Sequence, residues 1–72
     1  MEIRRVYGEI MNDAEFLEFK DTVDYLNIEL ETNHKVRTVF FNCPQHIKDE
    51  ANQWGWSDTV VRDELYKFME TL

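Results

Sequence analysis

No covalent cross-link within this chain can help it to fold, because Cys43 is its single cysteine. A small domain without disulfides is held together by buried apolar side chains, and a chain of 72 residues buries only about 60% of its unfolded surface. The composition supplies such side chains, since 43% of the residues are hydrophobic and 14% are aromatic. With two glycines and one proline, little of the chain is suited to loops. We therefore predict a single domain over residues 1–72.

The same features indicate a class of protein. The lack of a disulfide framework, of a signal peptide and of a long apolar run is typical of a cytoplasmic protein that does not enter membranes. A chain this short has little scaffold to wall a substrate cleft, so we expect a protein that is not an enzyme and uses no cofactor. His34 and His46 have no Cys or His partner at ligand spacing, so no metal site is predicted.

Negative charge is concentrated in one segment. Residues 9–31 hold eight acidic residues against Lys20 alone, which accounts for the whole net charge of −7. Such a field repels nucleic acids and anionic membranes and attracts basic surfaces. We therefore expect the partner to be a larger protein with a basic surface, and direct nucleic-acid binding is disfavoured.

The first third of the chain predicts a strand followed by a helix. Residues 2–11 carry apolar groups in an imperfect alternation that favours a strand. Asn12 or Asp13 can then cap a helix, because a short side-chain oxygen accepts from the free amides of a first turn. Helical spacing of apolar residues continues to about Asp24. The stripe consists of Phe16, Phe19 and Val23.

After Asp24 the apolar period changes to two. Leu26, Ile28 and Leu30 alternate with polar residues, which favours a second strand. A single helix that continues to Glu31 is the alternative. A polar turn follows over residues 32–35.

Residues 36–41 (VRTVFF) predict a third strand, and their apolar groups on both faces favour a central position. With two helices after it, the order is β-α-β-β-α-α. A right-handed first crossover leaves room between strands one and two, so we predict an α+β fold with a three-stranded sheet in the order 1-3-2 and helices packed on one face. The uncovered face would offer a surface for a homodimer. It would be lined by Arg37, Val39, Phe41 and Cys43.

The C-terminal third predicts two helices, one opened by Pro44 and one capped at Ser57 and Asp58. The segment ANQWGWSDTVVRDEL resembles a helix-turn-helix, because Ala51, Gly55 and Val61 have the spacing of its small residue, turn glycine and buried aliphatic residue. The segment departs from that motif at two positions that are usually apolar. These positions are occupied by Glu50 and Glu64.

The second of these helices offers a candidate surface of its own. Its residues are Trp56, Thr59, Arg62 and Tyr66. Only one of them is basic, whereas DNA binding depends on several phosphate contacts from Lys or Arg. Trp54 is predicted to lie in the core, while Trp56 is equally suited to anchor a partner or to pack across the turn.

The acidic helix is the main candidate site. Glu15, Glu18, Asp21 and Asp24 recur every third residue, a rise of about 4.5 Å that is comparable with the roughly 3.4 Å per phosphate along one DNA strand. Leu17 and Tyr25 lie on the same outer side, and apolar groups among charged ones are the usual composition of a contact patch. The predicted partner-binding residues are Asp13, Glu15, Leu17, Glu18, Asp21, Asp24 and Tyr25.

These patterns favour a non-catalytic protein-binding module. Its acidic helix would block a basic, nucleic-acid-binding surface of a larger partner, as do the small acidic inhibitors and nucleic-acid mimics that viruses and mobile elements encode. The alternative is a transcription-related adaptor or regulator built on the helix-turn-helix. Two further interpretations remain open, namely that the acidic face only keeps the protein soluble, and that Cys43 is a reactive thiol at a helix start.

Overall fold

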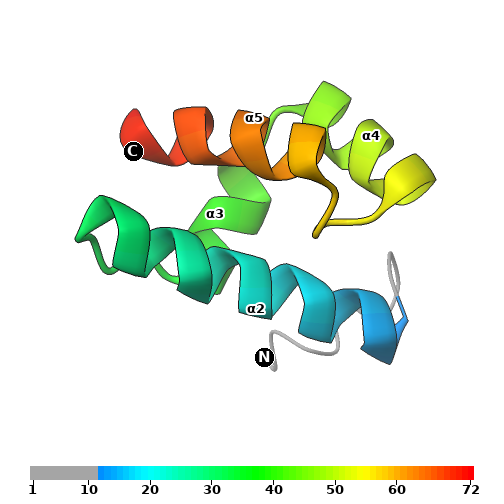
Figure 1. The fold of residues 1–72 in the computed structure, drawn as a ribbon, viewed down its shortest axis with the longest axis horizontal. Coiled ribbons are helices and arrows are strands. Elements are labelled where there is room, and N and C mark those ends of the chain that lie inside the picture. The colour runs from blue at the N-terminus through cyan, green and yellow to red at the C-terminus, as the bar shows by residue number, and fades with distance from the viewer. Residues whose placement is uncertain (1–11) are drawn as a thin grey trace.

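The computed structural model describes residues 12–72, and every regular element in this range is an α-helix (Figure 1). The helices are α2 (Asp13–Leu30), α3 (Val36–Asn42), α4 (Gln45–Trp54) and α5 (Thr59–Glu70). Figure 1 shows α2 and α5 running side by side toward the same end of the molecule, with α3 between them and α4 next to the start of α5. None of the helices over residues 12–72 is long and apolar enough to cross a membrane.

The predicted α+β fold with a three-stranded sheet is therefore wrong. The second and third predicted strands lie within α2 and α3, and no strand occurs in the described part of the chain. The first predicted strand, residues 2–11, lies outside the described residues.

The second predicted strand fails because its alternation does not match what is buried. Leu26 is buried against the core, whereas Ile28 is 77% exposed. Leu26 follows Val23 by three residues and precedes the partly buried Leu30 by four, so the buried positions continue the stripe of a helix. The single long helix considered as an alternative is the structure adopted. It ends at Glu31, which has the left-handed φ of 56° and whose N–H bonds to the carbonyls of Asn27 and Ile28.

The third predicted strand fails for a similar reason. Val36, Val39 and Phe40 are spaced by three and four residues, and Val39 and Phe40 are fully buried while Val36 packs against them. Thr38 and Phe41 face outward. The β-branched and aromatic composition favours a strand, but burial of this one face against α2 overrides that weak preference.

The predicted homodimer surface is lost with the sheet. Val39 and Cys43, which were expected to line an uncovered sheet face, are both buried in the core. Arg37 and Phe41 are exposed on the opposite side of a short helix. No sheet face is left within residues 12–72 to seat a second copy in the predicted manner.

Several local predictions are confirmed. Asn12 caps α2, since its Oδ1 accepts from the N–H of Glu15 at 2.8 Å. At the predicted cap of α5 it is Asp58 whose Oδ2 accepts from the N–H of Val60 at 3.0 Å, while the Ser57 hydroxyl, which was also predicted to cap this helix, donates to Glu18. Each cap satisfies an amide that has no partner inside the helix.

The core is a single cluster shared by all four helices. Phe19 lies at its centre, with its ring edge-on to Phe40 at 5.6 Å and to Trp56 at 4.5 Å between centroids. Trp54 differs from expectation, because it is 53% exposed and not in the core, whereas Trp56 is only 4% exposed and takes the packed position that was one of its two alternatives. The buried apolar residues are Phe19, Val23, Leu26, Val39, Phe40, Cys43, Ile47, Ala51, Trp56, Val61, Leu65 and Met69.

Gly55 makes the turn between α4 and α5. Its φ of 96° and ψ of 154° belong to a region that residues with a side chain rarely adopt. Its N–H bonds to the carbonyl of Ala51 at 2.7 Å, which closes the end of α4. A Cβ at this position would lie 2.7 Å from Oε1 of Glu18.

We expect Gly55→Ala to lower the free energy of unfolding by about 1–3 kcal/mol, the cost of holding an alanine in this backbone region. The displaced Glu18 side chain would add to that loss. Urea unfolding followed by circular dichroism measures it, with Gln53→Ala, at an exposed position of α4, as the control. An unfolding midpoint equal to that of the control would contradict the strain argument.

Candidate functional site

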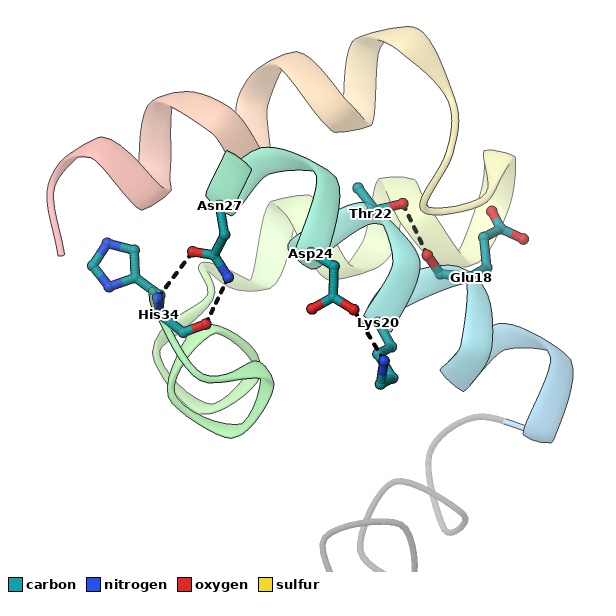
Figure 2. A network of polar contacts seen from close by, with 6 residues as sticks. All are labelled: Glu18, Lys20, Thr22, Asp24, Asn27 and His34. Carbon is teal, nitrogen blue, oxygen red and sulfur yellow. Dashed lines mark hydrogen bonds and ion pairs between the residues drawn. The ribbon is translucent and has the colours of Figure 1, made fainter. Parts of the chain in front are cut away.

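The candidate site lies where α2 packs beside α5. Thr22 is buried at this contact, and its hydroxyl lies 2.9 Å from the carbonyl of Glu18 and 3.3 Å from the carbonyl of Trp56. Figure 2 shows the contact within α2, with Thr22 turned toward Glu18. Because the two helices run in the same direction, successive turns of α2 meet successive turns of α5.

Glu18 joins α2 to the turn that precedes α5. Its Oε1 accepts from the N–H of Ser57 at 2.9 Å and from the Ser57 hydroxyl at 3.1 Å. The carboxylate thus satisfies an amide near the start of α5 that no helical carbonyl can reach. Glu18 was predicted as one of the four carboxylates that recur every third residue along the acidic helix. In the structure it also holds the α4–α5 turn in position.

Two others of these four carboxylates have partners on α2 or at its cap. Glu15 accepts from the Asn12 side-chain amide at 3.3 Å, next to the helix cap. Asp24 forms an ion pair with Lys20 at 2.9 Å, between side chains that are about half exposed (Figure 2). Because both side chains are about half exposed, solvent screens this pair and it contributes little to stability.

Lys20 is the single base of the acidic segment. Its pKa is raised, first by the hydrogen bond to Asp24, then by the charge of Asp24 and to a lesser degree by that of Asp21. One lysine is therefore shared between neighbouring carboxylates, and Asp21 remains exposed beside it. The bulk of the negative charge on α2 is left without compensation from within the helix.

Two shallow hollows adjoin between α2 and α5, with volumes of about 260 and 240 Å³. They share Tyr25 and Arg62, whose guanidinium lies over the Tyr25 ring at 5.5 Å from its centroid. We call this surface the α2–α5 groove. Its lining residues are Glu18, Asp21, Thr22, Tyr25, Leu26, Glu29, Ser57, Thr59, Arg62, Asp63 and Tyr66.

The groove brings together residues of the two surfaces that were predicted separately. Glu18, Asp21 and Tyr25 come from the acidic helix, and Thr59, Arg62 and Tyr66 come from the last helix. That these two sets share one groove could not be predicted from the sequence, because the parallel packing of α2 on α5 is a tertiary property. For the same reason, sequence reasoning did not identify Glu29 and Asp63 as groove residues.

Other predicted site residues lie outside the groove. Leu17 is 57% exposed on α2, and Asp13 and Asp24 are exposed on the same helix. Glu15 lines a separate hollow of about 290 Å³ that also involves Phe40 and residues of α4. Trp56 belongs to the core, where it cannot serve as the surface anchor that was considered.

The segment that resembles a helix-turn-helix consists of two helices, α4 and α5, joined by a turn at Gly55. Ala51 and Val61 are buried on either side of the Gly55 turn, as the spacing indicates. The outer face of α5, however, borders carboxylates from α2 and from its own Asp63. Asp63 also forms an ion pair with Lys67, at 3.3 Å. Negative charge at this edge would oppose the approach of a phosphate backbone.

Cys43 and the histidines offer little chemistry. Burial raises the pKa of the Cys43 thiol to about 11, and the charge of Lys48 only partly opposes this effect. The thiol is thus protonated at neutral pH, which favours a packing role over a nucleophilic one. Within residues 12–72, no three His, Cys, Asp or Glu side chains are grouped to hold a metal ion.

Comparison with known proteins adds no relative. The chain matches no protein-family model, no curated protein and no solved structure at a significant level.

Proposed function

We propose that this chain is a non-catalytic binding module that uses the acidic face of α2 and the adjoining α2–α5 groove to block a basic surface of a larger protein. The observation that carries the proposal is the composition of the groove. Four carboxylates and two tyrosines line it, and its single base, Arg62, is already stacked on Tyr25.

The distribution of charge supports a basic partner. The two ion pairs formed by lysines in the described range, Lys20–Asp24 and Lys67–Asp63, each lie within one helix. Neither brings a base from elsewhere onto the acidic face of α2. The carboxylates of α2 outnumber the single base of that helix, and this excess would attract a cationic surface.

Exposed apolar groups beside these carboxylates support a protein as the partner. Tyr25 is 48% exposed at the groove, and Leu17 is exposed two turns earlier on α2. An aromatic anchor surrounded by charged residues is the usual composition of a contact surface between proteins. If the partner's basic surface binds nucleic acid, occupation by this module would inhibit that binding.

The test compares two pairs of charge reversals with the same net change. Asp21→Lys with Glu29→Lys alters the groove at exposed positions, and Asp49→Lys with Glu70→Lys alters exposed positions outside it. Glu18 is left intact because it holds Ser57. We expect the groove pair to weaken binding of a short arginine-rich peptide at least about tenfold at low salt, or about 1.4 kcal/mol, and the control pair to weaken it much less.

Fluorescence anisotropy with the labelled peptide at two salt concentrations measures both effects. The difference between the pairs should shrink as salt rises, because screening weakens attraction between exposed charges. Equal losses in the two pairs would mean that only net charge matters, which would contradict a defined site. Binding of duplex DNA by the native chain, lost on Arg62→Ala, would instead favour the helix-turn-helix regulator.

A further inference from the structure

Two glutamates meet at the contact between α4 and α5. Glu50 precedes the buried Ala51 on α4, and Glu64 precedes the buried Leu65 on α5. Both side chains are partly buried, and one oxygen of each carboxyl group, Oε2, is shielded from solvent. Neither of these oxygens accepts a hydrogen bond from an N–H or hydroxyl donor within residues 12–72.

The group with the largest effect on Glu50 is the Glu64 carboxyl, which raises the Glu50 pKa as a hydrogen-bond partner. Two ionised carboxylates cannot donate a hydrogen bond, so this contact requires a proton on one of them. A shielded pair that lost this proton would place two like charges across the helix contact.

The surrounding charges determine how firmly the proton is held. The pKa of Glu50 is raised above its ordinary value by the hydrogen bond to Glu64, by desolvation and by the charge of Glu64. Asp58, at the start of α5, raises it further, whereas His46, one turn earlier on α4, lowers it.

We propose that Glu50 and Glu64 share one proton and form a pH-sensitive clasp between α4 and α5. The clasp occupies two positions that are usually apolar in a helix-turn-helix, and it replaces a pH-independent contact with one that depends on protonation. Because α5 forms one wall of the α2–α5 groove, the clasp also links the position of that wall to pH.

The direction of the pH effect follows from linkage. The folded protein binds the proton more tightly than the unfolded chain does, since the Glu50 pKa is raised only in the folded state. The contribution of the clasp to stability is therefore complete below the ordinary glutamate pKa. It is lost as the pH rises through the raised value.

Two measurements test the clasp. In the native chain, carbon-13 NMR of the glutamate side-chain carboxyls should show Glu50 titrating above the ordinary range of a glutamate. In thermal unfolding, the Glu50→Gln variant should have the same unfolding temperature as the native protein at pH 4. At pH 7 its unfolding temperature should be several degrees higher, because the neutral amide can donate to Glu64 at any pH. Glu70→Gln, the same change at an exposed site on α5, should show no such divergence.

The NMR titration needs no variant, so it decides the matter even if Glu50→Gln does not fold. Titration of Glu50 within the ordinary range of a glutamate would overturn the proposal. An effect of Glu50→Gln that is the same at every pH would also overturn it, because the side chain would then contribute packing and not a shared proton.

Discussion

Phe19→Ala is expected to remove most of the stability of this protein. Phe19 is fully buried and contacts the rings of Phe40 and Trp56, so its loss would leave a cavity at the centre of the core. Such truncations cost about 3–5 kcal/mol, whereas whole domains are stable by about 5–15 kcal/mol and small ones are at the lower end. We therefore expect a chain that is largely unfolded at 37 °C.

Helical circular dichroism and urea unfolding measure this effect. Phe41→Ala is the matched control, because it removes the same atoms from a side chain that is about half exposed on α3. Its expected loss is no more than about 1–2 kcal/mol, in proportion to the smaller area that it buries. If Phe19→Ala unfolded at the same urea concentration as Phe41→Ala, the assignment of Phe19 to the centre of the core would be wrong.

Asn27→Ala is expected to have the second largest effect. The Asn27 side chain closes the connection between α2 and α3, with its carboxamide facing the backbone of His34 (Figure 2). Its Nδ2 donates to the His34 carbonyl at 2.8 Å, and its Oδ1 accepts from the His34 N–H and the Thr32 hydroxyl, each at 2.9 Å. Alanine would remove all three bonds and leave the partly buried His34 backbone groups without partners, at a cost of about 2–4 kcal/mol.

Urea unfolding and hydrogen exchange at the His34 amide test this prediction. Asn42→Ala serves as the control, because the Asn42 side chain makes a single exposed bond, to the Thr38 carbonyl at 2.8 Å. Asn27→Asp should lie between the two, since it keeps the acceptor and loses the donor. Unchanged protection of the His34 amide in Asn27→Ala would show that the connection is held by other contacts.

The candidate site was partly predictable. The outward position of Tyr25 and the carboxylate of Asp21 follow from helical spacing along α2, which depends only on nearby residues. The role of Glu18 could not be predicted, because its partner Ser57 lies 39 residues away in the sequence. The same holds for the stacking of Arg62 on Tyr25, which requires α2 and α5 to be parallel neighbours.

Features that depend on a few neighbouring residues follow from the amino-acid sequence alone. Examples are the caps at Asn12 and Asp58 and the turn at Gly55, where short-range hydrogen bonds and backbone freedom leave one favourable arrangement. The sequence also determined that negative charge is concentrated in residues 9–31, since this follows from composition alone.

The choice between helix and strand at residues 26–30 and 36–41 depended on how the helices pack together. The same packing determined that Trp56 and not Trp54 is buried. In both segments the apolar residues fit either period, so local preference was too weak to choose. Burial made the choice. Only the helical form places Leu26 on the same side of α2 as Phe19, and Val39 and Phe40 in the same core. That same packing brought α2 beside α5 and so created the groove.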